Sequence, residues 1–473
     1  MNNKLLATLW IIITAGSVFI LANLTKPESV QENPPDYKLT EQTEVIENQP
    51  ANYAEYISAG DNFINQGNFQ KAIENYQKAA SINNSSADPL IKLTQAYLKN
   101  NQAKEAQSTI SRAQEIRKND TNIQLLLAQS FIDQRNFPAA KSLIDKLDQT
   151  NQEVLYYSGI LQILNKDFSK AKETFKNIQK PEAENFRNAY SKFEYFKEGE
   201  NLHLQVLLAK ALTEVGQYQA SIPLLFDVIN NKKNYLDAWI VLGYAYLNIN
   251  QSLDAVDALT NAKDLNPDKP ETLFFLGLAY FSNNDIEKAI FFLEKADASG
   301  YEPKEQIDLK LADLYLLQEK YQESEKKFTE VLSQNTNNLD IFTRVVWLNI
   351  DKLSNPEKAL NIAQAALTSH PDTAMSYNLV GWSLTANGNY SEAKTYLEKA
   401  ISMEPTLDAA HLNMGWLYEL KGQENKAKDY YKQAYNLGTG NSIANLAAQR
   451  FNNIAEKEVD TYYKQVNISS PSL

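Results

Sequence analysis

Residues of small size recur along this chain at a nearly constant interval, and this internal period constrains the fold more than any other feature. Most intervals are 34 or 35 residues long. A period in this range is typical of helical repeats that stack side by side, because one repeat alone cannot bury its apolar face. The recurring residues are Ala72, Ala106, Ala140, Ala171, Ala220, Ala255, Ala289, Ser324, Ala359, Ala393 and Ala427.

The stretch from Leu236 to Pro267 shows the pattern of one repeat most clearly. Its first half places apolar residues at helical spacing, and a second such run follows a polar turn. A glycine at position 243 allows the two helices to approach closely. We therefore predict a helix–turn–helix unit whose structural positions are Trp239, Leu242, Gly243, Tyr246, Ala255, Leu259, Ala262 and Pro267.

This spacing resembles the tetratricopeptide repeat (TPR), with Leu259 in place of the usual phenylalanine. The resemblance extends over eleven units and about 80% of the chain. It implies an all-α solenoid, a right-handed superhelix of helix–turn–helix repeats, with an inner surface that binds extended peptides or partner helices. We expect repeats 1–4 at residues 53–178 and repeats 5–11 at residues 201–441.

Two intervals depart from the period, and the first, from Ala140 to Ala171, is 31 residues, so the third unit is shortened. The interval from Ala171 to Ala220 is 49 residues, which leaves room for one added helix within residues 179–200. We interpret it as a structural wedge that divides the array into two lobes; an exposed docking helix is the alternative. At the carboxyl end, residues 442–473 are expected to form a capping helix and a tail. Its predicted buried stripe is Ile443, Leu446, Ala447, Phe451 and Ile454.

The amino-terminal segment is apolar and then acidic. Leu5 to Leu24 is long enough to span a bilayer as a helix, and we interpret residues 1–24 as an uncleaved signal anchor; a cleaved signal peptide is the alternative. Residues 25–52 contain four prolines and six acidic residues, so we expect an extended, disordered linker. We predict a single-pass protein of the cytoplasmic membrane with its body on the periplasmic or extracellular side.

Composition argues against catalysis and nucleic-acid binding. The formal net charge is −12, the chain has no cysteine, and its three histidines, His203, His370 and His411, lie in different repeats. No phosphate-binding loop, zinc-protease motif, nucleophile elbow or calcium loop occurs in the sequence. We predict no enzyme activity, no cofactor and no metal site.

The TPR resemblance places candidate partner-binding residues on the inner surface of the later repeats. Position 9 of the first helix is largely polar in repeats 1–4 but becomes tryptophan in repeats 9–11. These indoles are either binding anchors or packing residues. The candidates are Trp347, Trp382, Trp416, Tyr244, Phe274, Phe281, Asn248 and Asn378.

Three functions remain open from the sequence. The preferred one is a membrane-anchored scaffold that binds a partner protein or peptide for cell-envelope assembly. A cytosol-facing adaptor with the same repeats, and a binder of envelope polymers or glycans, are the alternatives. The Lys/Asn/Arg clamp of chaperone-docking TPR domains is absent, since the corresponding early positions include Ile57, Asp61 and Gln95.

Overall fold

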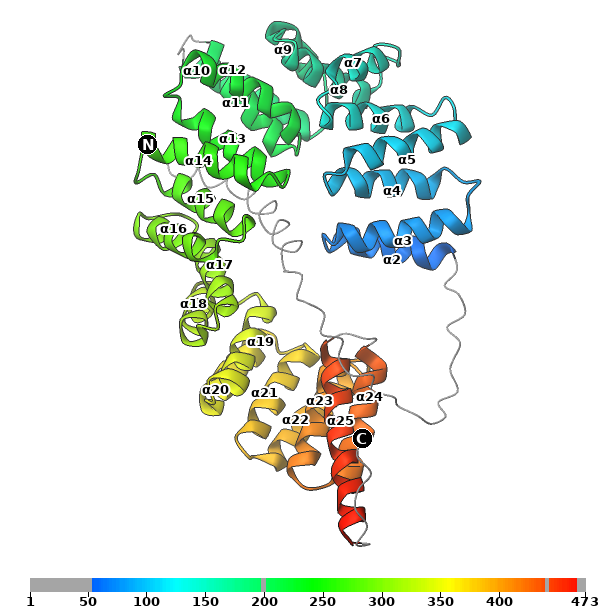
Figure 1. Cartoon of the computed structure of the whole chain (residues 1–473), viewed down its shortest axis with the longest axis vertical. Helices are drawn as coiled ribbons and strands as arrows, with labels where there is room; N and C mark the ends of the chain where they lie inside the picture. Colours follow the sequence, from blue (N-terminus) through cyan, green and yellow to red (C-terminus); the bar gives the residue numbers. More distant parts are fainter. Residues whose placement is uncertain (1–52, 197–200, 439–441, 466–473) are drawn as a thin grey trace. The chain divides into compact units, whose positions relative to one another are not determined.

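The computed structural model describes residues 53–196, 201–438 and 442–465. Every regular element in these ranges is helical, and consecutive helices pair in antiparallel hairpins (Figure 1). The predicted all-α repeat array is therefore confirmed. The predicted membrane span and the linker lie outside the described residues. Within the described ranges, none of the helices combines the length and the apolar character that crossing a membrane requires.

The chain divides into two compact units, Met1–Tyr301 and Glu302–Leu473. The N-terminal unit holds seven helix pairs and one added helix, α10. Its helices are α2 (Tyr53–Asn65), α3 (Phe69–Ile82), α4 (Asp88–Lys99), α5 (Ala103–Ile116), α6 (Thr121–Asp133), α7 (Phe137–Ile144), α8 (Gln152–Leu164), α9 (Phe168–Lys176), α10 (Glu182–Phe196), α11 (Asn201–Glu214), α12 (Tyr218–Asn231), α13 (Leu236–Asn248), α14 (Ser252–Leu265), α15 (Pro270–Ser282) and α16 (Ile286–Ala298).

The C-terminal unit holds the last four pairs and the terminal helix. Its first helix in repeat 9 is short and continues as a π-helix, η1. The elements are α17 (Lys304–Leu317), α18 (Tyr321–Gln334), α19 (Leu339–Trp347), η1 (Leu348–Lys352), α20 (Pro356–Ser369), α21 (Ala374–Ala386), α22 (Tyr390–Met403), α23 (Asp408–Leu420), α24 (Glu424–Gly438) and α25 (Ser442–Gln465).

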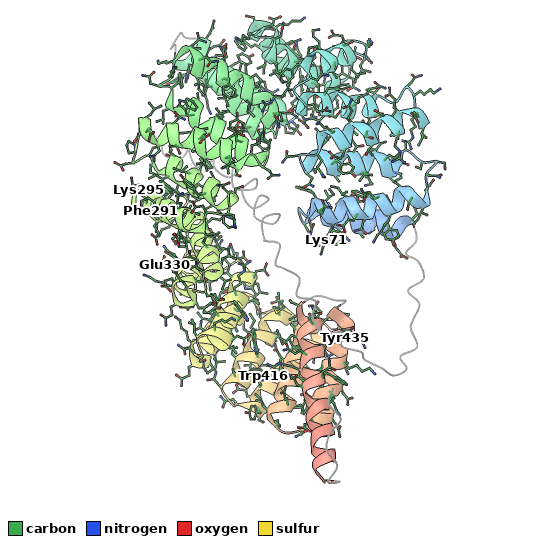
Figure 2. All side chains as sticks on the ribbon, in the orientation of Figure 1. Lys71, Phe291, Lys295, Glu330, Trp416 and Tyr435 are labelled. Atoms are coloured by element: carbon green, nitrogen blue, oxygen red, sulfur yellow. The ribbon has the colours of Figure 1, made fainter. Side chains whose placement is uncertain are left out.

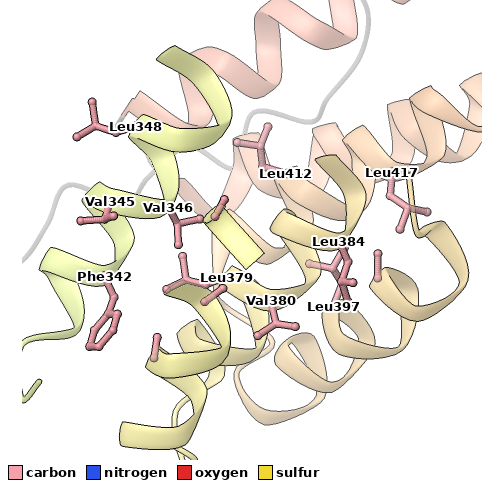
Figure 3. Packing of buried hydrophobic residues seen from close by; sticks show 14 of the residues in the cluster. Phe342, Val345, Val346, Leu348, Leu379, Val380, Leu384, Leu397, Leu412 and Leu417 are labelled. Atoms are coloured by element: carbon pink, nitrogen blue, oxygen red, sulfur yellow. The ribbon is translucent and has the colours of Figure 1, made fainter. Parts of the chain in front are cut away.

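In six of the hairpins a glycine of the first helix lies against a large side chain of the second helix, which lets the two helices pack closely. A Cβ atom on Gly243 would lie 2.4 Å from Cγ of Leu259, so no larger residue fits there. The same juxtaposition occurs at Gly381, where Leu397 is the facing residue. Around Leu397 the C-terminal unit buries a continuous apolar core that includes Val380, Leu384 and Leu417 (Figure 3). Burial of this core stabilises the stack of hairpins.

The turn inside every repeat passes through the left-handed region of backbone conformation. Only four of the eleven turn residues are glycines, although glycine adopts positive φ most readily. Asparagine accounts for three of the others, as its short polar side chain tolerates this conformation. The residues are Gly67, Asn101, Arg135, Lys166, Gly216, Asn250, Asn284, Glu319, Ser354, Gly388 and Gly422.

The helix predicted as a wedge is α10, and it lies inside the N-terminal compact unit. It packs on α9 on one side and on α11 on the other. Phe186 is fully buried and stacks on Phe175, with 4.1 Å between ring centroids. An aromatic core thus runs through α10, and the boundary between compact units falls later, after Tyr301.

The terminal helix α25 packs on α24 and begins at Ser442 as predicted, but it extends to Gln465. Ala447 and Ile454 are buried, and Ile443 and Phe451 pack against the same core. Leu446 is 38% exposed, so its assignment to the buried stripe is wrong. The stripe that covers the last repeat is therefore narrower than the sequence predicts.

Candidate functional site

The signature residues of repeat 6 have structural roles. Leu242, Ala255, Leu259 and Ala262 are buried, and Gly243 makes the close approach described above. Tyr246 is 8% exposed, whereas Pro267 lies on the surface in the turn after α14. Trp239 is half-buried, and its indole Nε1 donates to the Lys233 carbonyl at 2.8 Å. Most of these residues therefore pack inside the repeat, as their structural assignment predicts.

Three tryptophans of the C-terminal unit form what we call the tryptophan row: Trp347, Trp382 and Trp416. They occupy the same position on α19, α21 and α23, the consecutive first helices of repeats 9–11, which contact one another. Each side chain is half-buried. Trp347 and Trp382 pack against the core with part of the indole, and the remainder stays accessible.

The terminal helix supplies a cation to one end of the row. The Arg450 guanidinium lies over the Trp416 ring, 5.7 Å from its centroid, and donates to Oε2 of Glu419 at 3.2 Å (Figure 2 marks Trp416). Tyr431 donates its hydroxyl to the same carboxylate oxygen. Glu419 on α23 therefore holds the Arg450 side chain of α25 in place over the ring.

At the other end of the row, Trp347 is the last residue of α19, directly before the π-helix, and has charged neighbours. The Lys352 ammonium lies 5.7 Å from its ring centroid. Burial raises the pKa of the Asp351 carboxyl, while Arg450, Lys352 and a hydrogen bond from Trp347 favour the charged form. π-helical turns often mark functional sites. The end tryptophans thus meet cations of this chain.

Asn378 has a structural position beside the row. It is 2% exposed, and its Oδ1 accepts from Nδ2 of Asn413 at 2.9 Å, which links α21 to α23. An amide buried in this way has little surface to offer a partner.

The remaining four candidates belong to the N-terminal unit. Phe274 is 1% exposed and stacks on Tyr301, with ring centroids 4.1 Å apart. Tyr244 is 9% exposed and contacts Phe275. Phe281 is half-buried on α15. Asn248 donates to the Tyr244 carbonyl at 2.8 Å and borders a cavity that the sequence did not predict.

We call this space the N-terminal cavity; it has a volume of about 760 Å³. First helices of repeats 1–4 form one part of its wall, and the turns of repeats 5 and 6 form another. Its polar lining includes Asp61, Lys92, Gln95, Lys99, Gln129, Asp133, Tyr157, Tyr218, Gln219 and Asn248. Position 9 of repeats 1–3 thus lines this cavity. The polar residues at that position were the one feature of the sequence that could have indicated a polar site here.

Polar bonds connect the two parts of the cavity wall. Gln129 on α6 and Gln217 before α12 exchange amide hydrogen bonds of 2.9 and 3.3 Å. Arg135 donates to Oε1 of Gln219 at 2.8 Å, and Asn101 donates to the Asn248 carbonyl at 2.8 Å. Residues about 80 to 150 positions apart in sequence therefore meet, which a period of neighbouring repeats does not predict.

Charges on the cavity wall are unequally neutralised. Asp61 accepts from Tyr76 at 2.6 Å and from Lys92 at 2.7 Å, and these donors hold its pKa below the usual range against the effect of burial. Asp133 instead has one amide donor, Nε2 of Gln129 at 2.8 Å. Burial raises the pKa of Asp133 to about 7, and only that hydrogen bond opposes the effect.

The three histidines lie apart, and one ring nitrogen of each is within hydrogen-bond distance of a hydroxyl or carbonyl group. His203 Nδ1 is 2.9 Å from the Tyr235 hydroxyl, and His411 Nε2 is 2.9 Å from the Pro405 carbonyl. His370 Nε2 is 3.2 Å from the Asn337 carbonyl. In the part of the chain that the structure describes, no three histidine or acidic side chains gather as a metal site would require.

Comparison with known proteins identifies the repeats. A family model described as tetratricopeptide repeat matches residues 63–130 and 384–449. A second model with the same description matches residues 240–303 and 351–406.

Curated relatives include the peroxisomal targeting signal receptors of two yeasts. The receptor of Candida albicans is 27% identical over 190 residues, which are 38% of this chain and 32% of the relative. The receptor of Debaryomyces hansenii is 24% identical over 278 residues, 52% of this chain and 46% of the relative. The chain thus spans less than half the length of these relatives.

Among solved structures, yeast Tom70 is 16% identical, with a TM-score of 0.31 over 88% of this chain and 91% of that chain. The Cut9–Hcn1 assembly of the APC/C is 13% identical, with a TM-score of 0.31 over 84% of this chain and 96% of that chain. The family matches lie in both compact units, and each unit therefore contains tetratricopeptide repeats.

Proposed function

We propose that this chain is a non-catalytic scaffold that binds a partner protein or peptide on the tryptophan row. The observation that carries the proposal is the alignment of Trp347, Trp382 and Trp416 on three consecutive first helices, each with part of its indole accessible. Tryptophan is a frequent binding anchor, because its large rigid ring is buried at little entropic cost and its N–H is a donor.

Two further observations support a peptide as the ligand. Curated relatives are named as receptors for a targeting signal. In addition, the row is a series of equivalent anchors on adjacent repeats, which suits an extended chain that contacts several repeats. The same series would also suit a polymer of sugars, so glycan binding is the second candidate function.

The central residue of the row gives the test. We expect Trp382→Ala to weaken partner binding by about 2 kcal/mol or more, the usual scale of a hot spot. If the indole served packing alone, the change would instead lower the free energy of unfolding by about 3–5 kcal/mol. Thermal unfolding and affinity are measured on the same full-chain variant, with a partner first recovered by crosslinking to the wild-type chain.

Trp239→Ala is the matched control, since it removes a half-buried indole from outside the row. It should leave affinity unchanged. A Trp382→Ala protein with wild-type affinity and a strongly lowered melting temperature would contradict the proposal. Quenching or enhancement of tryptophan fluorescence by glycans, with no response to the partner peptide, would favour the second candidate.

The proposed site of action is the outer side of the cytoplasmic membrane, where the scaffold would serve envelope assembly. The apolar run Leu5–Leu24 supports an anchor, and the acidic, proline-containing residues 25–52 support a spacer. A reporter enzyme fused to the carboxyl terminus tests this: activity only in the exported compartment is expected. Activity only in the cytosol would favour the cytosol-facing adaptor.

A further inference from the structure

The N-terminal cavity has the properties of a binding site in its own right, separate from the tryptophan row. Its volume of about 760 Å³ falls in the range of sites that bind small molecules or a few residues of a peptide. A water molecule occupies about 30 Å³ of liquid, so the space accommodates a group much larger than ordered water. Its wall combines tyrosine rings with a few polar side chains.

One wall residue, Asp133, has a fixed hydrogen-bond donor but no cation beside its carboxylate among the described residues. The amide group of Gln129 is oriented by the reciprocal bonds with Gln217, and its nitrogen therefore points to Oδ1 of Asp133 at 2.8 Å. Among the interactions of the described residues, Asp133 takes part in no ion pair. Asp133 is half-buried, and a carboxylate that loses part of its hydration without gaining a cation is costly.

The basic side chains that the structure describes in and near the cavity do not form an ion pair with Asp133. Lys92 neutralises Asp61 at 2.7 Å. Arg135, in the turn after Asp133, donates to Gln219. Lys99 lies at the exposed carboxyl end of α4 and does not contribute to the pKa of Asp133. Burial raises the pKa of the Tyr157 phenol on α8, and the nearby charge of Asp133 raises it further.

We propose that the N-terminal cavity binds a primary ammonium or guanidinium group through the carboxylate of Asp133. The cation supplies the ion pair that Asp133 lacks, and the rings of Tyr157 and Tyr218 line the space around it. An anionic ligand would instead face the uncompensated carboxylate of Asp133. The group belongs either to a free linear polyamine or to a lysine or arginine side chain of a peptide.

This assignment makes binding depend on pH in a defined direction. A pKa of about 7 means that the free protein must lose a proton from Asp133 before the ion pair forms. Affinity should therefore rise by about 30-fold from pH 5.5 to pH 8 and then level off. The ammonium group of the ligand stays charged over this range, because its own pKa is about 10.4.

Isothermal titration of the full chain tests the proposal with two probes. One is spermidine, and the other is acetylated and amidated glycyl-lysyl-glycine; its norleucine analogue lacks the charge. Binding of either charged probe is expected, with at least a tenfold loss in Asp133→Asn. The probe that binds more tightly identifies the source of the cation. Asp372→Asn removes an exposed carboxylate outside the cavity and should bind as wild type.

Several results would overturn the inference: equal binding of the norleucine analogue, unchanged binding in Asp133→Asn, or no binding of either charged probe at millimolar concentration. If Asp133→Asn does not fold, the pH series on the wild-type chain decides, and an affinity independent of pH would be fatal. Trp382→Ala should leave cation binding unaltered, so a failure here and a failure of the tryptophan row are distinguishable.

Discussion

The same position of the repeat has opposite chemistry in the two compact units. In repeats 1–3 it holds Asp61, Gln95 and Gln129, which line the polar N-terminal cavity. In repeats 9–11 it holds the tryptophan row. Hairpins in the two units are built alike, with Gly159 against Phe175 in the first unit and Gly415 against Tyr431 in the second. Binding chemistry therefore varies at a position on which the hairpin itself does not depend.

The largest effect should come from the shared hairpin contacts and should be similar in both units. Phe175 and Tyr431 are fully buried against their glycines. We expect Phe175→Ala and Tyr431→Ala each to lower the free energy of unfolding by about 3–5 kcal/mol, because each leaves a cavity. Denaturant unfolding followed by circular dichroism measures this. A large cost in only one unit would show that the hairpins are not equivalent.

A smaller loss is expected from Gly381→Ala. The added Cβ would lie 2.6 Å from Cγ of Leu397, and the helices must separate slightly to admit it. The expected cost is about 1–3 kcal/mol, typical of overpacking. In a Leu397→Ala background the same glycine change should cost much less, since the obstructing side chain is absent. Equal costs in both backgrounds would exclude steric contact as the cause.

The hairpins were predictable because their period depends on local packing. Small residues at one helix crossing and large ones opposite recur in many of the repeats, so this packing requirement is repeated in the sequence. Leu259 in place of phenylalanine did not obscure it, as both fill the space over Gly243. The position of the boundary was not predictable. The interruption of the period suggested a division at α10, but α10 shares an aromatic core with α9 through Phe186, and the boundary falls after Tyr301.

The candidate sites were predictable only in part. The spacing of the tryptophans placed them on consecutive first helices, but it did not show that Phe274 and Asn378 would be buried by Tyr301 and Asn413. The N-terminal cavity depends on contacts such as Asn101 with Asn248, which join residues 147 positions apart. Nothing in the period of adjacent repeats encodes such contacts.

The carboxyl of Asp133 in the N-terminal cavity should make the stability of the N-terminal unit depend on pH, and Asp351, whose pKa burial also raises, acts in the same direction in the C-terminal unit. Asp133 binds a proton more tightly when folded, with a pKa of about 7, than when unfolded, with a pKa of about 3.9. Between these values the folded state holds more protons, so its contribution to stability falls as pH rises from about 4 to 7 and is constant above. Thermal unfolding across this range measures the effect.

Asp133→Asn should reduce that pH dependence and raise the melting temperature at pH 8 relative to the wild type. The asparagine retains an oxygen that accepts from Gln129 and carries no charge to desolvate. An Asp133→Asn protein with the same decline in stability between pH 4 and 7 would assign the decline to other groups.

The smallest effect should come from Arg450. This residue lies on the terminal helix α25, which covers the last repeat of the C-terminal unit. Arg450→Gln removes the cation above Trp416 and the bond to Glu419. We expect a loss of about 0.5–1 kcal/mol, the scale of an exposed cation–π pair. Chemical denaturation of the variant at low and high salt measures it. A loss that is unchanged in high salt would point to packing of the side-chain stem.

The hydrogen bond between Asn378 and Asn413 has a consequence for the order of the repeats. Nδ2 of the buried Asn413 donates to Oδ1 of the buried Asn378, so repeats 10 and 11 fit each other as a matched pair. A duplicated or grafted repeat placed between them would remove this bond, at a cost of about 1–3 kcal/mol for a buried polar group left unsatisfied. At this junction the repeats are therefore not interchangeable.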